Sequence, residues 1–370
     1  MTWIILALLS HLVFIPGLFD GFSLPKRVYV FGLGIAALIY AFRHRNRLPL
    51  FPWIGAYLLV SFIPIFWVAN IPVFIERLAL DVACFAVFWA VAVSRFKPDS
   101  YSLAVLFSIA VAVIVLMAEH FYPTSHGVMG NPAYSAFVSA QAATLPTTMI
   151  GLFPVFAALV LVVMATASRA AIAAAIIALF LIGVTRHIRF AVKVSTFLVL
   201  VTMILVMLYA GRSDLEQFRS RWIVWKNTAA MVSTPATWIF GIGRGQFEIQ
   251  YPAYANHYEK DDQMLVSADH KRQFLLVWGH PHNEIINLAL ETGVLGEALY
   301  WMILCSVLFV YEGRDRLALS LWGSLITTLL FSVFWFPFSH PSMAITFWAT
   351  AGLLWNYSKN SPKLEFWARR

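Results

Sequence analysis

The sequence has 370 residues, of which 61% are hydrophobic and only 12% are charged. A soluble domain carries roughly 25% charged residues, so this composition excludes an ordinary water-soluble globule and makes the bilayer the main solvent. The net charge of +8 does not indicate nucleic acid, because the basic residues lie mostly in short breaks between apolar runs. Cys84 and Cys305 both fall inside apolar runs and predict neither a disulfide nor a zinc site nor a redox pair.

In chain order, the apolar runs predict an all-α, polytopic membrane protein, because a spanning helix needs about 20 mostly apolar residues. The first run has no basic start and no cleavage site, so we interpret it as a spanning helix instead of a signal peptide. We find no internal repeat and no pair of broken helices. Twelve spans are predicted, at residues 2–19, 28–42, 51–69, 72–93, 102–120, 133–149, 150–166, 170–185, 191–210, 284–311, 317–337 and 343–357.

The short breaks between these spans predict the orientation. With the N-terminus in the cytoplasm, the cytoplasmic breaks receive most of the Lys and Arg residues, whereas the short outer breaks receive only Lys26, Arg27 and Arg169. Both termini are therefore expected in the cytoplasm. The predicted organisation is helices 1–9 in residues 1–210, an outer loop domain in 211–283, and helices 10–12 with a short tail in 284–370.

The start of the outer loop predicts an amphipathic helix in the membrane interface. Ser213 is a plausible N-cap with Glu216 three residues on, as in a capping box. Arg221 precedes Trp225 by four residues, so the two share one side of the helix. Arg219 and Arg221 fit either lipid phosphates or, for Arg221 especially, a buried ligand. An apolar stripe is expected at Leu215, Phe218, Trp222, Trp225 and Ala229.

Two further polar features fall in this region of the chain. Arg169 lies among small residues in a break between two apolar spans, on the predicted outer side of the membrane. This position fits either a side chain that snorkels to the membrane surface or an arginine that faces the bundle interior. Gly241, Gly243 and Gly245 alternate around Arg244, and this pattern favours a tight structural turn over a phosphate loop, because no Gly-Lys-Ser/Thr follows.

The stretch HPHNEIINLALETGVLG at 280–296 places polar residues at the start of an apolar helix. Asn283 is a good N-cap and Glu284 suits the positive end of the helix dipole. We expect the same helix end to keep His282 neutral, as a base must be. Ordinary interface histidines are the alternative for His280 and His282, and the HPH spacing is a weak metal signal.

These motifs resemble the bacterial O-antigen ligase superfamily, which includes lipopolysaccharide O-antigen ligases, protein O-oligosaccharyltransferases and O-antigen polymerases. His282-Asn283 with Gly293 and Gly296 is similar to the family's H-N-x9-G-x-x-G pattern. Three other segments also resemble family motifs: Gly127 to Pro132, Ser168-Arg169, and Arg221-x-x-x-Trp225 with Gly241-Ile-Gly243. The resemblance covers about residues 120–300, and the first hundred residues match only in hydropathy.

The resemblance implies a GT-C-type glycosyltransferase in the bacterial inner membrane with its active site on the periplasmic side. It implies transfer from undecaprenyl pyrophosphate to an acceptor hydroxyl, inverting and without a metal or other cofactor. His282 is then the general base, and Arg169 and Arg221 bind the leaving pyrophosphate. Asn283, Arg244, Arg272 and Asn131 are expected to contact sugar or phosphate.

The acceptor stays open between lipid A-core and a protein such as a pilin, with a growing glycan as a third choice. The letters HPHNE favour the protein-glycosylating branch. Few residues follow the last predicted span, so we expect no extra C-terminal domain of the kind that many members of that branch carry. A non-catalytic carrier of lipid-linked sugar is the competing class, although repeats and broken helices typical of transporters are not found.

Overall fold

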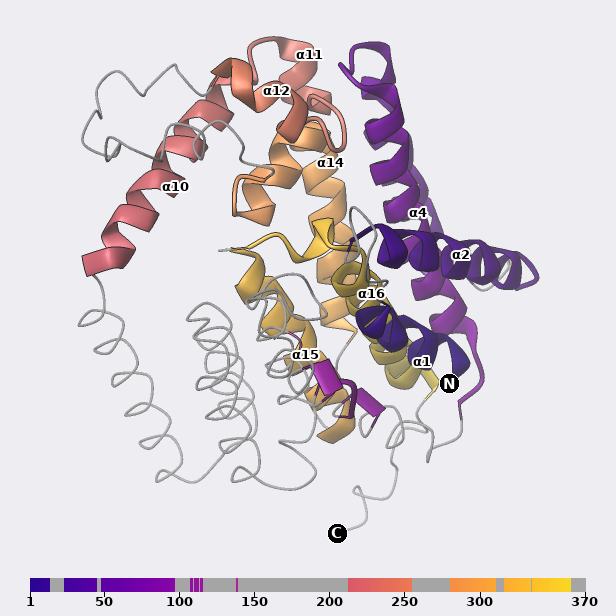
Figure 1. The fold of residues 1–370 in the computed structure, drawn as a ribbon. Coiled ribbons are helices and arrows are strands. Elements are labelled where there is room, and N and C mark those ends of the chain that lie inside the picture. Colours follow the sequence, from indigo (N-terminus) through magenta and orange to yellow (C-terminus); the bar gives the residue numbers. More distant parts are fainter. Residues whose placement is uncertain are drawn as a thin grey trace.

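The computed structural model describes residues 1–13, 23–44, 48–96, 212–254, 280–310, 316–333 and 335–360, with scattered residues between 107 and 138. Every regular element in these ranges is helical, which confirms the all-α prediction for the described part of the chain. In Figure 1 the N-terminal helices and the last helix form one side of the molecule, and the helices of the predicted outer loop gather at one end.

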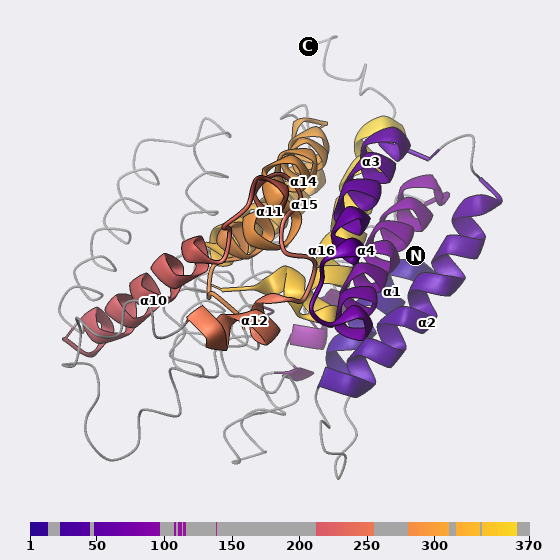
Figure 2. The ribbon, with the colours of Figure 1, turned by 90° about the horizontal axis from the view of Figure 1, so that it is seen from above.

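The N-terminal helices pack closely with the last described helix. They are α1 (Thr2–Leu9), η1 (Ser10–Leu12), α2 (Ser23–Phe42), α3 (Phe51–Phe62), η3 (Ile63–Phe66) and α4 (Ile71–Val93), and the last helix is α16 (Pro341–Asn360). Figure 2 shows α4 between α16 and α2, and α4 packs against both. A Cβ on Gly352 would lie 2.6 Å from the Phe88 carbonyl oxygen, so this glycine lets the backbones of α16 and α4 approach.

Two described helices are long and apolar enough to cross a membrane, Ser23–Phe42 and Glu284–Phe309. Shorter apolar helices cover Thr2–Leu12, Phe51–Phe66 and Leu317–Ser332. Helix α4 has the length of a span but also carries Glu76, Arg77 and Asp81. The five predicted spans between 102 and 210 lie almost wholly outside the described residues, so the count of twelve stays a prediction.

Helix α2 shows how such a span meets its surroundings. Val28, Ile35 and Ile39 are each more than half exposed, while Val30 and Ala37 on the other side are completely buried. The helix thus presents one apolar face to the neighbouring helices and another to the medium that surrounds the protein. An exposed apolar stripe along a helix of this length is typical of contact with lipid.

The predicted outer loop contains α10 (Arg212–Ala230), α11 (Pro235–Phe240) and α12 (Phe247–Tyr254). The amphipathic helix is therefore confirmed, although α10 already includes Arg212 and so begins before the expected cap at Ser213. Trp222 and Ala229 of the predicted apolar stripe are exposed on the protein, and their place in the membrane interface stays a prediction. The side that α10 buries consists of Ile223, Val224, Asn227 and Thr228. The protein itself covers this second side, which leaves Trp222 available to the membrane interface.

The remaining described helices are α14 (Glu284–Phe309), α15 (Arg316–Ser332) and the 3-10 turn η7 (Pro337–Ser339). Helix α14 is broken at Gly293, whose φ of 67° and ψ of 177° are not helical. One broken helix is not the pair, one in each half, that we expected to be missing, so that prediction stays untested. A sequence in which Gly293 follows nine good helix residues does not show whether the helix continues through the glycine, because glycine tolerates either conformation.

Candidate active site

The two histidines of the HPH sequence lie directly before α14. Asn283 caps the helix, since its side-chain oxygen accepts a hydrogen bond of 3.1 Å from the Ile286 N–H, as predicted. His282 has a φ of 53°, in the left-handed region that non-glycine residues rarely occupy. Unusual backbone of this kind often occurs at functional sites, where the surrounding structure fixes it. The left-handed residue directly before the cap is therefore a candidate functional position.

Two aromatic side chains from the turn between α15 and α16 contact these rings. His280 stacks on Phe336 with ring centroids 4.1 Å apart. His282 makes edge contacts with Phe336 at 5.2 Å and with Trp335 at 5.3 Å. Sequence reasoning missed this contribution. The aromatic run FWFPFSHP at 334–341, placed between two apolar helices, was the signal that could have found it.

Helix α10 approaches the same loop with two side chains. The Trp225 indole N–H donates a hydrogen bond of 2.7 Å to the Pro281 carbonyl oxygen. The half-buried Arg221 lies with its guanidinium carbon 6.0 Å from the centre of the Trp335 ring. The prediction that Arg221 and Trp225 share the inward side of α10 is therefore confirmed. Arg221 and His282 both contact the Trp335 ring, so a cation and an imidazole lie close together beside the start of α14.

Burial, and then the charge of Arg221, lower the pKa of His282 from its ordinary 6.5 to about 4. Burial followed by the charge of Arg77 holds the pKa of His280 well below its usual range. Both rings are therefore neutral at pH 7, as a base must be. We expected the helix end to keep His282 neutral, but burial is the main cause, because the aromatic rings exclude water from the imidazole.

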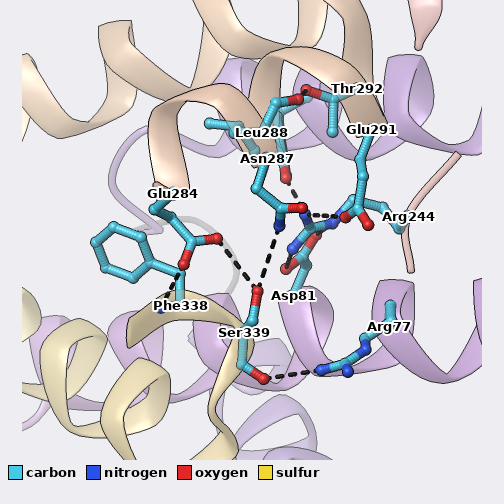
Figure 3. A network of polar contacts seen from close by, with 11 residues as sticks. Arg77, Asp81, Arg244, Glu284, Asn287, Leu288, Glu291, Thr292, Phe338 and Ser339 are labelled. Atoms are coloured by element: carbon cyan, nitrogen blue, oxygen red, sulfur yellow. Dashed lines mark hydrogen bonds and ion pairs between the residues drawn. The ribbon is translucent and has the colours of Figure 1, made fainter. Parts of the chain in front are cut away.

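A set of polar contacts joins the start of α14 to the turn at 335–340 (Figure 3). The Glu284 carboxylate accepts a hydrogen bond of 3.1 Å from the Phe338 N–H and one of 3.3 Å from the Ser339 hydroxyl. From α4, Arg77 donates a bond of 2.8 Å to the Ser339 carbonyl oxygen. Glu284 was expected only to suit the helix dipole, and its contact with a distant turn was not predictable from local sequence.

At the other end of the first segment of α14, two glycines meet backbone to backbone. Gly241, Gly243 and Gly245 all have positive φ, so the predicted structural turn is confirmed. A Cβ on Gly293 would clash with the Ile239 carbonyl, and one on Gly241 would clash with the backbone of Glu291. The break frees helix carbonyls that accept bonds of 3.0 Å from the Ile242 and Gly243 N–H groups. We call this contact between 239–243 and 290–293 the glycine junction.

Arg244 lies beside the glycine junction in a buried ion-pair set. Its Nε and one terminal nitrogen bond the two oxygens of Asp81 at 2.9 and 3.0 Å, and the other terminal nitrogen bonds Glu291 at 2.9 Å. The Tyr57 hydroxyl adds a bond of 3.0 Å to Asp81. The side chain is 4% exposed, and all three guanidinium nitrogens face carboxylates. As placed, Arg244 joins α4 to α14, while its predicted contact with substrate stays untested.

Three other predicted site residues are not among those that the structure describes. Arg169, Arg272 and Asn131 lie outside the described residues, so their roles stay predictions. Asn283 is occupied as the helix cap, and sugar contact by this residue is likewise untested. The structure thus brings together His282, Arg221 and Asn283 from the predicted set. It adds Arg77, Glu284, Trp335 and Phe336, which sequence reasoning missed.

Comparison with known families gives one finding that covers this site. Residues 154–301 match the model of the family described as O-Antigen ligase, and the matched region includes His282, Arg221 and the glycine junction. This confirms the resemblance predicted from the motifs. It supports membrane-associated glycosyl transfer of the ligase and polymerase kind in general. No curated protein matches the chain.

Proposed function

We propose that this chain, which carries an O-antigen ligase domain at residues 154–301, moves a glycan from undecaprenyl pyrophosphate to an acceptor hydroxyl. The reaction would occur at the periplasmic face of the bacterial inner membrane. One observation carries the proposal: a neutral imidazole and an arginine, His282 and Arg221, contact the same tryptophan ring beside a helix start. A base for the acceptor and a cation for the leaving group are the two groups that this reaction requires.

His282 is proposed as the general base. It takes the proton of the acceptor hydroxyl while that oxygen attacks the anomeric carbon and the bond from this carbon to the pyrophosphate oxygen breaks. The attack comes from the side opposite the leaving group, so the product has inverted anomeric configuration. The aromatic contacts with Trp335 and Phe336 limit rotation of the ring, and this positioning favours the productive approach.

Arg221 is proposed to bind the leaving pyrophosphate, with Arg169 as a second cation. A guanidinium matches phosphate oxygens through paired hydrogen bonds, so the developing charge can be stabilised without a metal. Arg221 also lowers the pKa of His282. A bound pyrophosphate would offset that charge, and the basicity of His282 would rise when the donor is in place. The site thus couples donor binding to activation of the acceptor.

The acceptor proposed first is lipid A-core, with a pilin or another periplasmic protein as the alternative and a growing glycan after these. A carrier of lipid-linked sugar is the competing class, and the broken α14 bears on it because transporters use the free carbonyls of broken helices to bind ions. In this chain the Leu290 and Glu291 carbonyls already accept backbone hydrogen bonds from Ile242 and Gly243. This occupancy favours a structural break over an ion site.

The test uses purified protein in proteoliposomes with an oligosaccharide on undecaprenyl pyrophosphate. Lipid A-core and pilin are supplied in separate reactions with EDTA, and wild type is compared with His282→Ala. We expect transfer to one acceptor, and a loss on the order of 10²–10⁴-fold in His282→Ala, because the general base is gone. Mass spectrometry of the acceptor and NMR of the new linkage measure yield and configuration.

The other outcomes separate the alternatives. Glycan elongation with neither acceptor present indicates a polymerase. Donor that crosses the bilayer without any transfer indicates a carrier and rejects the enzyme. Transfer by His282→Ala at close to the wild-type rate removes the base assignment, and transfer that EDTA abolishes removes metal independence.

A further inference from the structure

The turn that carries Trp335 and Phe336 is held by two charged side chains from other helices. Glu284 of α14 accepts hydrogen bonds from the Phe338 N–H and the Ser339 hydroxyl. Arg77 of α4 donates to the carbonyl oxygen of the same serine. Figure 3 shows Ser339 between the two side chains, at the point where three helical regions meet. One residue of the turn is therefore fixed from two sides, by a carboxyl group and by a guanidinium.

Glu284 is buried and Arg77 is half-buried, so an ionised group at either position loses part or nearly all of its hydration. Glu284 is only 3% exposed, and removing a carboxylate from water costs several kcal/mol unless hydrogen bonds compensate. Within the described part of the chain Arg77 makes no ion pair with a carboxylate, and its guanidinium donates a hydrogen bond to the Ser339 carbonyl oxygen. The mechanism proposed above uses neither residue. Both side chains bond the same turn, which indicates that their role is to hold this turn in place.

The turn transmits this restraint to the histidines through a short, stiff path. Phe336 is followed by Pro337, and the Ser339 N–H donates a bond of 3.2 Å back to the Phe336 carbonyl oxygen. A shift of Ser339 therefore moves Phe336. Phe336 stacks on His280 at 4.1 Å and touches His282 at 5.2 Å, so the position of both rings depends on the position of Ser339.

We infer that Glu284 and Arg77 are positioning residues that clamp Ser339 and thereby hold Phe336 and Trp335 against His280 and His282. This inference rests on the proposed function for its effect on transfer, but its structural part does not. The clamp keeps water away from the His282 ring and fixes its direction. Without the clamp the turn moves outward, and the imidazoles become exposed and free to rotate.

The first test needs no donor or acceptor. Diethyl pyrocarbonate reacts with accessible neutral imidazoles, and peptide mass spectrometry resolves the modification of each histidine. Glu284→Ala, Arg77→Gln and Ser339→Ala in proteoliposomes should each show several-fold faster modification of His280 and His282 than wild type. Matched controls are Glu297→Gln, a second carboxylate of α14, which bonds Trp301, and Ser306→Ala, whose hydroxyl bonds the helix backbone. Both controls should react as wild type does.

The second test measures transfer. Glu284→Ala should lower kcat by about 10²-fold with little change in KM, because small displacements of a catalytic group have effects of this size. The acid limb of its pH profile should move up toward 6.5, since hydration of His282 raises its pKa. Glu284→Gln should restore most of the activity, because an amide oxygen still accepts the bond from Phe338. If Glu284→Ala only destabilised the fold, the amount of active enzyme would fall, but the pH at which activity declines on the acid side would not change.

The outcomes separate this inference from the proposed function. Unchanged histidine modification in all three variants overturns the clamp, whether or not the protein transfers glycan. Faster modification in a protein without any transferase activity retains the clamp and rejects the proposed function. If Gln and Ala at 284 lose transfer equally while the histidines stay protected, the carboxylate acts directly and the positioning role is wrong. Should Glu284→Ala fail to fold, Ser339→Ala removes only a hydroxyl and carries the same test.

Discussion

The two ends of the first segment of α14 use polar groups in opposite ways. At the glycine junction the backbone groups pair with one another, and all three nitrogens of Arg244 bond carboxylates. At the histidine loop the rings face aromatic side chains, and the buried Nδ1 of His280 has no hydrogen-bond partner among the described residues. A completed set of bonds fixes structure, whereas unused bonding capacity is available to a ligand.

The comparison also separates two arginines that look alike in sequence. Arg244 and Arg221 both lie in the predicted outer loop near glycines or aromatics, and both were candidates for phosphate binding. Arg244 is 4% exposed with two carboxylate partners, while the half-buried Arg221 lies over a tryptophan beside His282. The first joins helices, and the second is the arginine that we propose to bind an anionic substrate. Each of the following substitutions tests one side of this distinction.

The largest expected effect is on stability, at Arg244. Arg244→Gln leaves the buried carboxylates of Asp81 and Glu291 without their cation, which costs about 3–5 kcal/mol of folding free energy. The control is Arg27→Gln, because Arg27 pairs with Glu76 at 2.7 Å while both side chains are about one-third exposed. A pair as exposed as this contributes less than about 1 kcal/mol. Chemical denaturation in detergent compares the two variants, and equal losses would contradict a structural role for Arg244.

The glycine junction should respond next. Gly293→Ala places a Cβ on a residue with a φ of 67° and against the Ile239 carbonyl. The backbone conformation alone costs about 1–3 kcal/mol. Gly32→Ala in helix α2 is the matched control, since a Cβ there meets no described atom within 4 Å, and it should be neutral or slightly stabilising. The midpoint of thermal unfolding reports both, and a silent Gly293→Ala would mean that the break in α14 is not required.

These contrasts also show what the sequence could and could not predict. Helix existence followed from apolar runs, so α2, α3, α4, α14, α15 and α16 were anticipated, although α3 ends at Phe62 where the predicted span ran to 69. The cap at Asn283 and the turn at Gly241 to Gly245 followed from local chemistry. Such features depend on neighbours in the chain, and a single sequence contains those neighbours.

The features that were missed all depend on contacts between distant parts of the chain. Glu284 bonds a turn more than 50 residues away, and Arg244 bonds Asp81 across 163 residues. The sequence pattern of α10 showed a stripe with Trp222, but it did not show that the protein covers a second side with Ile223 and Val224. Apolar periodicity shows which residues can be buried, but the partner that buries them is not in the local pattern. For this reason Arg244 was a binding candidate and Asp81 was not considered.

On the other side of the comparison, Arg221 should affect transfer more than stability. Arg221→Ala removes a proposed charged contact with the pyrophosphate, worth about 1.5–3 kcal/mol, which corresponds to roughly 10–100-fold in kcat/KM for the donor. Arg221→Lys should rescue only in part, since an ammonium lacks the paired donors of a guanidinium. Lys226→Ala, on the same helix beside Trp222, should change transfer less than twofold. Full rescue by lysine would argue for a general field effect in place of a specific contact.

The smallest effect, and the most specific, is a shift in pH dependence. His282 must be neutral to accept a proton, so activity falls as the pH decreases through its pKa, which is about 4 in the free protein. The acid limb of kcat/KM for the donor should therefore lie near that value, and the limb of kcat should lie higher, because bound pyrophosphate offsets Arg221. Arg221→Gln should raise the limb of kcat/KM but keep it below 6.5, since burial, the larger cause, remains. Lys226→Gln should leave it in place. If the limb in Arg221→Gln does not move, then Arg221 and His282 do not interact as their shared contact with Trp335 implies, and the coupling of donor binding to the base is wrong.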